Sequence, residues 1–343
     1  MKFIGLFLFL GLLACNTNQA TKNQNYYELG GYTQGTSYHI TFGADEFINL
    51  KPEIDSILDK INNSLSVYDS TSIISRINRN DTPVIPDQYF IDVITKSIEI
   101  MELSNGAFDI TVAPLIDFWG FGPNGPVKKD KRQIENILKH IGSSKINLAQ
   151  GKFTKSSDDV KINVNAIAQG YTVDVVSNLF TKKGIRNFLV EIGGEVRTMG
   201  INKDGKIWKV GIDKPADRIP NQQNEIQAIV SLKDMSISTS GNYKKFYIEN
   251  GFKYSHTINP KTGYPAKNEM LSATIIAKDC ATADALATAC MVLGLEEGKK
   301  FISRLPDVEC FFIYSRGTAQ DEIYFSPGFE KYFDKTNADE SKY

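Results

Sequence analysis

The chain has 343 residues, of which 39 are Lys or Arg and 40 are Asp or Glu, so its formal net charge is -1. This balance argues against the strongly basic surface that nucleic-acid-binding or polybasic membrane-binding proteins carry. The length allows one large unit of mixed helices and strands with a sizeable core.

The N-terminus has the pattern of an export signal. Lys2 precedes an apolar run at residues 3–13 that is too short to span a bilayer and ends in small residues. The segment Leu12-Leu13-Ala14-Cys15 resembles a bacterial lipobox. We therefore expect a signal peptide over residues 1–14, lipidation of Cys15 and a flexible polar tether over residues 15–25. An ordinary signal peptide with an incidental cysteine is the alternative, and both predict export.

Apolar periodicity predicts the elements that follow, because strands alternate with period two and helices repeat with period 3.6. The predicted strands are residues 37–42, 160–164, 188–192, 208–212, 226–232, 271–277 and 308–314, with a hairpin of residues 245–248 and 252–255 around Asn250-Gly251. The predicted helices are residues 53–65, 89–103, 131–141, 166–180 and an alanine-rich run at residues 279–290. Strands and helices intermingle, as in an α/β or α+β domain.

Cysteine usage gives no sign of a metal site or of a disulfide framework. Without Cys15, the chain keeps Cys280, Cys290 and Cys310, an odd number without metal-type spacing. We expect all three to be buried thiols.

The alanine-rich run carries the most informative polar pair. Asp284 and Thr288 are four residues apart, so their oxygens share one face of the predicted helix. Hard cations such as Mg²⁺ prefer oxygen donors and usually bind through one or two carboxylates plus the phosphates of a substrate. On its own the pair is weak evidence, because many helices carry an Asp and a Thr four apart merely as solvated or capping residues.

Three further segments can contribute to a site. Residues 163–171 pass from the predicted strand into a helix with small residues at its start, where a ligand can approach the backbone and anions are favoured. Residues 254–265 contain His256, for which a structural histidine in a hairpin is the alternative. Tyr68 lies near a loop, and a ring packed in the core is its alternative. The helix start, the His256 loop and the Asp284 helix together supply the parts of a metal-assisted phosphate site.

Taken together, these motifs resemble the ApbE family, the FAD:protein FMN transferases. The matching segments follow one another along nearly the whole mature chain, and so many ordered matches are more specific than any single one. They are Gln34-Gly35-Thr36, Leu65-Ser66-Val67-Tyr68, Gly106-Ala107-Phe108-Asp109-Ile110-Thr111, Trp119-Gly120-Phe121-Gly122, Ala166-Ile167-Ala168-Gln169-Gly170-Tyr171-Thr172-Val173-Asp174, Gly193-Gly194-Glu195, Ser238-Thr239-Ser240-Gly241, residues 254–263, and residues 283–289.

The resemblance implies the fold and the site. The implied fold is α+β (mixed α/β): a single large two-lobed ApbE-like (T-fold-like) domain over residues 26–334, with mainly antiparallel sheets flanked by helices, before a polar tail over residues 335–343. The implied Mg²⁺ is held by Asp284, Thr288 and the Ala166 carbonyl and is completed by FAD phosphates. The implied FAD-binding residues are Gln34, Tyr68, Ala107, Phe108, Asp109, Asn163, Gln169 and Ile258.

The implied reaction is transfer of FMN from FAD to a Thr or Ser hydroxyl of an acceptor protein, forming a phosphoester and releasing AMP. His256 is the candidate base, and Asp284 is the weaker candidate because a metal-bound carboxylate is a poor base. Asn163 and Gln169 stand where many family members have Asp and Lys, but amides still hydrogen-bond a nucleotide.

The expected partners are exported flavoprotein subunits of membrane redox complexes that display a Ser/Thr-Gly-Ala-Thr-like motif. The lipid anchor is expected on the periplasmic face of the inner membrane, with the outer membrane as the alternative. A Mg²⁺-dependent FAD pyrophosphatase that yields FMN and AMP is a second reading of the same site. A non-catalytic FAD-binding lipoprotein is a third.

Overall fold

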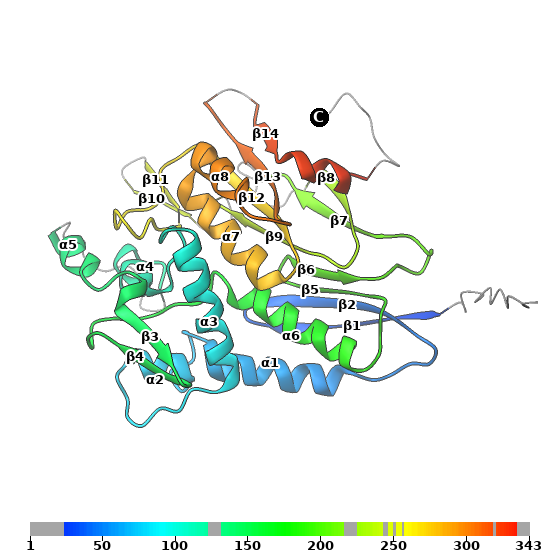
Figure 1. The fold of residues 1–343 in the computed structure, drawn as a ribbon, viewed down its shortest axis with the longest axis horizontal. Helices are drawn as coiled ribbons and strands as arrows, with labels where there is room; N and C mark the ends of the chain where they lie inside the picture. The colour runs from blue at the N-terminus through cyan, green and yellow to red at the C-terminus, as the bar shows by residue number, and fades with distance from the viewer. Residues whose placement is uncertain are drawn as a thin grey trace, which may run out of the picture.

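The computed structural model describes residues 24–122, 132–215, 225–242, 246–249, 252–255, 257–317 and 320–334, with only the backbone for 246–249 and 252–255. Its centre is an eight-stranded antiparallel sheet (Figure 1). In spatial order the strands are β1 (Asn25–Thr33), β2 (Thr36–Ala44), β5 (Phe188–Ile192), β6 (Glu195–Met199), β9 (Ser236–Gly241), β12 (Met270–Ala277), β13 (Glu309–Tyr314) and β14 (Glu322–Phe325).

Two helices lie across one face of this sheet (Figure 1). Helix α6 (Ala168–Lys182) packs on β5 and β6, whereas α7 (Cys280–Leu293) packs on β9 and β12. Behind them lie α1 (Lys51–Leu65) and α3 (Gln88–Leu103). The shorter helices are α2 (Ile73–Asn78), α4 (Ala113–Trp119), α5 (Arg132–Leu138) and α8 (Leu295–Ile302), with the 3-10 turns η1 (Ile110–Val112), η2 (Ser143–Lys145) and η3 (Pro327–Tyr332).

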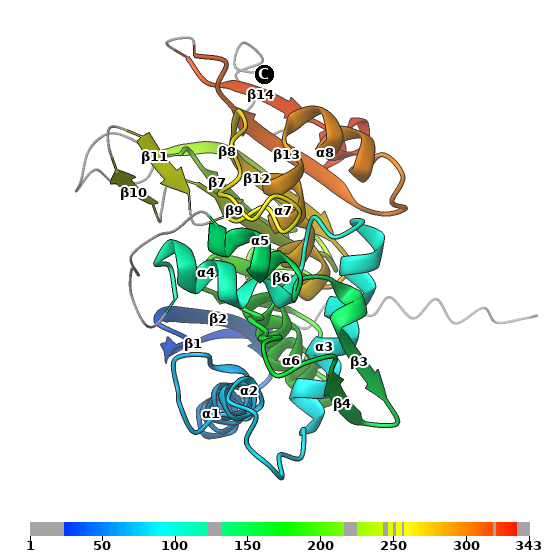
Figure 2. The same ribbon diagram turned by 90° about the vertical axis from the view of Figure 1, so that its left-hand side faces the viewer.

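The opposite face of the sheet is covered by a two-stranded ribbon of β7 (Trp208–Asp213) and β8 (Ile226–Leu232), together with η3. Ile237 and Ile276 face this layer, where they cluster with Val230 and Phe329. Two further antiparallel ribbons pair β3 (Ile146–Ala149) with β4 (Lys152–Lys155) and β10 (Phe246–Glu249) with β11 (Phe252–Ser255). Figure 2 shows the β3–β4 ribbon beside α3. The central strands of the sheet are therefore buried on both faces, by helices on one and by the β7–β8 ribbon on the other, whereas the edge strand β1 is mostly exposed or half-buried.

Helix α7 is the most enclosed of the described helices. Most of its side chains are buried, and the five buried alanines among them let the sheet and α6 approach closely. Cys280, Cys290 and Cys310 are fully buried free thiols, as predicted. Burial raises the pKa of each of these thiols. The cysteines therefore act as small core residues in this structure.

The predicted α+β class with mainly antiparallel pairing is confirmed, but the predicted strand at residues 160–164 is wrong. Val160, Ile162 and Val164 alternate inward and are fully buried, which is the pattern that suggested a strand. Their backbone is satisfied differently, because the Asn78 side chain accepts from the Ile162 amide and donates to its carbonyl, each at 2.8 Å. In this extended segment, hydrogen bonds between the Asn78 side chain and the Ile162 backbone therefore take the place of hydrogen bonds to a neighbouring strand.

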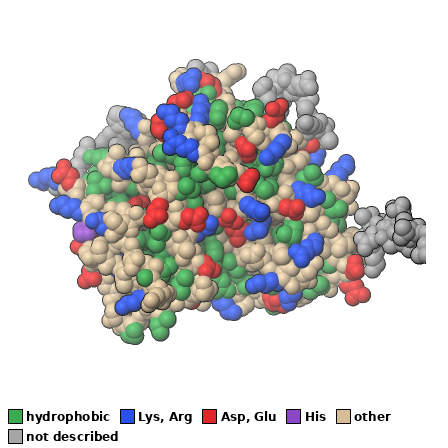
Figure 3. Space-filling model, in the orientation of Figure 1, with side chains coloured by type: hydrophobic (Ala, Val, Ile, Leu, Met, Phe, Trp, Pro, Cys, Tyr) green, Lys and Arg blue, Asp and Glu red, His purple; other side chains and the backbone are tan. Residues whose placement is uncertain are grey.

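The surface has no dominant sign of charge. Figure 3 shows Lys and Arg side chains interspersed with Asp and Glu on the viewed face, in agreement with the net charge of -1. Among the described residues, no helix combines the length and the apolar character needed to cross a membrane. The predicted signal peptide, Cys15, most of the tether and the tail at residues 335–343 lie outside the described residues.

Candidate active site

A cavity of about 310 Å³ lies where the start of α6, the middle of α7 and the end of β9 meet the loops after α1, α3 and β11. Its volume is at the lower end of the range for small-molecule sites. Ten of the residues predicted from the sequence line it: Tyr68, Ala107, Phe108, Asp109, Asn163, Ala166, Gln169, Ile258, Asp284 and Thr288. Residues of the α6 start, of the loop after β11 and of helix α7, which were expected to form one site, are therefore brought together.

Asp284 is one of three buried carboxylates that line this cavity, with Asp109 and Glu195. It is only 6% exposed, and its Oδ2 accepts a hydrogen bond of 3.0 Å from the Gly170 amide at the start of α6. Burial raises the pKa of Asp284 to about 7, and the Gly170 amide opposes that rise. A cation placed beside the carboxylate would favour its ionised form.

The same hydrogen bond changes the start of α6. In a continuing helix the Gly170 amide would donate to the Ala166 carbonyl four residues earlier, but here it donates to Asp284. Among the described residues, no backbone hydrogen bond ends on the Ala166 carbonyl. An oxygen acceptor is thus left at the cavity wall beside the Asp284 carboxylate.

Thr288 supplies a hydroxyl one turn beyond Asp284. Its Oγ1 lies 3.2 Å from the Oγ of Ser240, which belongs to β9 and also lines the cavity. Among the described residues, no group of three or more His, Cys, Asp or Glu side chains could hold a metal ion. Asp284, Thr288 and Ala166 together offer one carboxylate, one hydroxyl and one carbonyl, a set that suits a hard cation whose remaining ligands come from a substrate.

The turn at residues 107–111 forms another wall. Asp109 is 8% exposed and accepts from the Thr111 amide at 2.7 Å and from the Thr111 hydroxyl at 2.5 Å. Burial raises the pKa of Asp109 to about 6, against the effect of both hydrogen bonds. Ala107 and Phe108 are buried beside it and give this wall an apolar surface.

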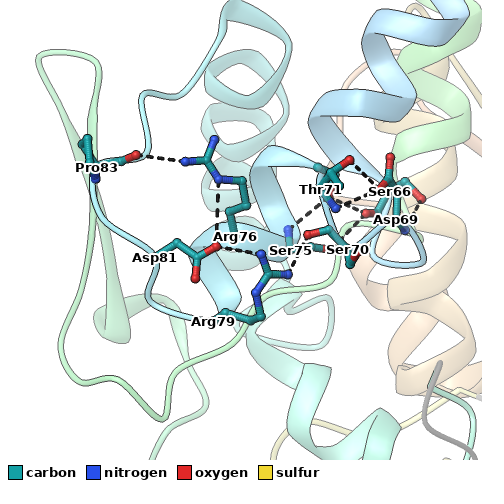
Figure 4. A network of polar contacts seen from close by, with 10 residues as sticks. Ser66, Asp69, Ser70, Thr71, Ser75, Arg76, Arg79, Asp81 and Pro83 are labelled. Atoms are coloured by element: carbon teal, nitrogen blue, oxygen red, sulfur yellow. Dashed lines mark hydrogen bonds and ion pairs between the residues drawn. The ribbon is translucent and has the colours of Figure 1, made fainter.

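Tyr68 stands in the loop between α1 and α2 and is 63% exposed, so the alternative of a core-packed ring is wrong. The loop itself is ordered by polar contacts (Figure 4). Ser66 Oγ accepts from the amides of Tyr68 and Asp69, each at 3.3 Å, and the Ser66 carbonyl accepts from the Ser75 hydroxyl at 3.2 Å. An exposed aromatic ring is thereby held on a fixed backbone at the cavity.

Ile258 lies in a compact loop stabilised by its own turns. Asn259 pairs with Tyr264 and Gly263 through backbone hydrogen bonds of 2.8 and 2.9 Å. Trp119 Nε1 donates to the Gly263 carbonyl at 2.7 Å, which joins this loop to α4. Ile258 is buried in the same apolar cluster as Trp119.

Two amide side chains mark the passage into α6. Asn163 Oδ1 accepts from the Asn165 amide at 2.9 Å, and the Asn163 amide donates to the Ile110 carbonyl at 2.7 Å. Gln169 lies against Gly193, where an added Cβ would come within 2.6 Å of Gln169 Nε2. A glycine with φ of +66° is therefore required at this point of the cavity wall.

One predicted residue of the described part of the chain, Gln34, is not among those that line the cavity. Gln34 occupies the tight turn between β1 and β2, where its Nε2 donates to the Thr172 hydroxyl on α6 at 2.7 Å. His256 lies outside the described residues, next in sequence to Thr257, which does line the cavity.

Sequence reasoning did not assign Ser240 or Gly193 to the site. The hydroxyl-rich run at residues 236–241 and the Gly193-Gly194 pair were available signals. Nothing in their local pattern showed that they meet α7 and α6, because that proximity depends on the strand order of the sheet.

The fold and the cavity define an α+β protein whose oxygen donors suit a cation and a phosphate-bearing ligand. Comparison with known proteins is consistent with this. Residues 34–312 match the model of the ApbE family. An FAD:protein FMN transferase of Vibrio cholerae is 35% identical over 79% of this chain and 82% of the relative. One of Haemophilus influenzae is 33% identical over 85% of this chain and 86% of the relative.

Solved structures agree with the sequence relatives. The flavin transferase ApbE from Vibrio cholerae matches with a TM-score of 0.80 at 31% identity, over 90% of this chain and all of the other (100%). The apo form of the Pseudomonas stutzeri flavinyl transferase ApbE matches with a TM-score of 0.81 at 28% identity, over 91% and 98%. The chain therefore belongs to the ApbE family and is a transferase.

Proposed function

We propose that this chain is a Mg²⁺-dependent FAD:protein FMN transferase. The acceptor hydroxyl oxygen forms a bond to the FMN phosphorus of FAD, the bond from that phosphorus to AMP breaks, and the hydroxyl proton passes to a base. The products are a flavin phosphoester on Thr or Ser and free AMP. The observation that best supports this proposal is the meeting of Asp284 on α7 with the amide start of α6 inside one cavity.

The residues present fit the implied cation. Asp284, Thr288 and the Ala166 carbonyl would hold it, and this set with its single carboxylate leaves positions for phosphate oxygens. When bound, Mg²⁺ neutralises charge on the reacting phosphate and orients the pyrophosphate.

The remaining residues bind and orient the nucleotide. Phe108 and Ile258 offer apolar walls for a ring system, and Tyr68 offers an exposed ring for stacking. Asn163 and Gln169 are neutral hydrogen-bonding groups that can contact phosphate or base edges. Gln34 acts from a distance by bonding Thr172 on α6.

Incubation with FAD, Mg²⁺ and an acceptor protein tests the proposal. We expect the intact mass of the acceptor to rise by that of FMN less water, with release of AMP. Free FMN without a labelled acceptor would identify a pyrophosphatase instead. FAD binding without any turnover would identify a carrier.

Replacement of Asp284 tests the metal assignment. Asp284→Ala should abolish Mg²⁺-dependent turnover in a folded protein, because it removes the one carboxylate among the proposed ligands. Asp279→Ala is the matched control, because it removes an acidic helix cap from the same helix outside the cavity. Undiminished turnover in Asp284→Ala would remove the metal assignment.

The proposed setting is outside the cytoplasm. A lipid on Cys15 would hold the enzyme at the periplasmic face of the inner membrane, near redox subunits that display a Ser/Thr-Gly-Ala-Thr-like acceptor motif. Cys15→Ser is expected to move the protein from the membrane fraction to the soluble periplasmic fraction. Retention in the membrane fraction would contradict the anchor.

A further inference from the structure

Helices α6 and α7 hold each other by reciprocal hydrogen bonds. The Gly170 amide at the start of α6 donates to Asp284 of α7 at 3.0 Å. In the other direction, the amides of Cys280 and Ala281 at the start of α7 donate to Asp174 of α6 at 3.0 and 2.9 Å. The N-terminal amides of each helix are thus bound by a carboxylate of the other.

Asp174 is built into this contact. It is 8% exposed, and Arg197 of β6 places Nη1 2.6 Å from its Oδ1. Burial raises the pKa of Asp174, whereas Arg197 and the two α7 amides oppose the rise. The carboxylate therefore has two backbone donors and a cation around it, and it ties together α6, α7 and the sheet.

The helices are also as close as their backbones permit. A Cβ on Gly170 would lie 2.4 Å from the Cys280 carbonyl oxygen and 2.8 Å from the Asp284 Cβ. Asp174 follows Gly170 by one turn on α6, and Asp284 follows Cys280 and Ala281 by one turn on α7. If Asp174 lost its hydrogen bonds to the Cys280 and Ala281 amides, α7 would shift along α6. This shift would move Asp284 away from the Gly170 amide.

We propose that Asp174, supported by Arg197, is a positioning residue for the cation site: it fixes the first turn of α7 so that the Asp284 carboxylate faces the cavity in one orientation. The inference rests on the proposed function, because it gives Asp284 the role of cation ligand. Residues that orient a ligand typically change metal affinity or activity by about 10–100-fold when they are replaced.

Asp279 provides a matched control for a merely structural role. It caps the same helix by accepting from the Thr282 amide at 2.9 Å, and among the described residues its side chain forms no hydrogen bond or ion pair with α6, although its charge contributes to the raised pKa of Asp174. Loss of either acid weakens the start of α7, and only loss of Asp174 releases α7 from α6. The two variants Asp174→Asn and Asp279→Ala therefore separate positioning from capping.

The test uses Mn²⁺ as the probe in the presence of FAD, with free Mn²⁺ followed by electron paramagnetic resonance. We expect Asp174→Asn to raise the Mn²⁺ Kd and the KM for Mg²⁺ by about tenfold or more, with the rate restored by excess Mg²⁺. Asp279→Ala should lower the Tm comparably and leave the Mn²⁺ Kd within about twofold, because it removes the helix cap alone. Equal Mn²⁺ affinity in the two variants would overturn the inference.

A second variant covers the case in which Asp174→Asn does not fold. Arg197→Gln removes the positive charge beside Asp174 and keeps both of its hydrogen bonds to the α7 amides. We expect it to raise the Mn²⁺ Kd by less than Asp174→Asn does. An unchanged Mn²⁺ Kd would count against the inference. The parent enzyme separates the two proposals. A parent that binds no Mn²⁺ and transfers no FMN contradicts the proposed function, whereas an active parent with unaffected variants contradicts only the positioning role.

Discussion

The same Asp-x-Thr turn occurs in two loops that border the cavity, with opposite effects on the acid. Asp69 and Asp109 each accept from the amide and the hydroxyl of the Thr two residues later. In the exposed turn, the hydrogen bonds from Thr71 lower the pKa of Asp69. In the buried turn, desolvation dominates and raises the pKa of Asp109 to about 6. Burial, and not the local motif, therefore decides whether the pKa of the Asp is raised or lowered.

Asp109 should make folding less favourable as the pH rises. Its folded pKa of about 6 lies above its ordinary value of 3.8, so the unfolded chain releases this proton first and stability falls between about pH 4 and 6. Asp109→Asn should therefore stabilise the protein at pH 7.5 by on the order of 1–3 kcal/mol. Calorimetric Tm values between pH 4 and 8 measure the difference, which should vanish near pH 4.

Asp69→Asn serves as the control for that experiment. Because the folded pKa of Asp69 is lowered, its contribution is present at neutral pH and is lost as the pH falls. The Asn variant should gain nothing at pH 7.5. A gain of the same size in both variants would show that removal of any negative charge, and not burial of Asp109, is responsible.

His256 remains the predicted base for the acceptor hydroxyl. Its replacement by Ala should lower kcat by about 10²–10⁴-fold, the usual contribution of a general base. His39→Ala is the comparison, because His39 lies on β2, pairs with Glu191 and is not among the residues that line the cavity. A near-normal rate in the His256 variant, measured by acceptor mass, would give the role to another group.

At this scale, sequence spacing could identify Asp284 and Thr288, because both belong to one helix and their separation fixes their common face. It could not identify Asp174 and Arg197 as partners of α7. Their contact joins α6, β6 and α7, and depends on how these elements pack. Local periodicity carries no information about that packing.

Among the elements, the loop that carries Ile258 depends on a single glycine. Gly263 has a φ of +76°, and an added Cβ would meet Ile134 Cγ2 of α5 at 2.4 Å. Gly263→Ala should destabilise the protein by about 1–3 kcal/mol through overpacking and should raise the KM for FAD, because Ile258 moves with the loop. Denaturant unfolding and initial rates at varied FAD measure the two effects.

Gly205→Ala separates strain from overpacking. Gly205 has a φ of +72°, but nothing lies within 4 Å of its added Cβ. Its variant carries the backbone cost alone and should leave the KM for FAD unchanged. If both variants raise that KM equally, the packing of the Ile258 loop against α5 does not govern binding.

The prediction of helices and strands succeeded where the apolar pattern is compatible with only one type of secondary structure. The strands at residues 188–192 and 226–232 were predicted with the bounds observed for β5 and β8. The first strand, β1, was not predicted, because its glycines and tyrosines lack clear alternation and it lies at the sheet edge. The failure at residues 160–164 shows the opposite problem, since inward alternation is also satisfied by an extended segment bonded to Asn78.

At the scale of the whole molecule, the sheet separates two cores. The helical face carries the cavity, whereas the β7–β8 ribbon and η3 enclose an aromatic core around Phe311 and Phe329 on the other face. The buried apolar residues on the two faces form separate clusters, which are joined by the strands of the sheet. Stability and substrate binding should therefore respond differently to core substitutions on the two faces.

Phe329→Ala should show this separation. The side chain is fully buried, so its loss should cost about 3–5 kcal/mol. The KM for FAD should stay unchanged at temperatures where the variant is folded. Phe108→Ala, on the cavity side, should lose comparable stability and also raise the KM, and thermal unfolding with steady-state kinetics measures both.

The α+β class could be expected from the alternation of strand and helix patterns, and the family followed from the order of the motifs. The strand order β1-β2-β5-β6-β9-β12-β13-β14 could not be derived from the sequence. Several orders satisfy the same hydrophobic patterns, and choosing among them requires the packing of all layers at once.

Away from its cavity-lining residues, helix α7 leaves no free space for its buried alanines to become larger side chains. A methyl group added to Ala283, Ala285, Ala287 or Ala289 must displace a neighbouring element, whatever the chemistry of the new side chain. Space alone should thus restrict most of this helix to small residues. A saturation library should tolerate far fewer replacements there than along the amphipathic helix α1.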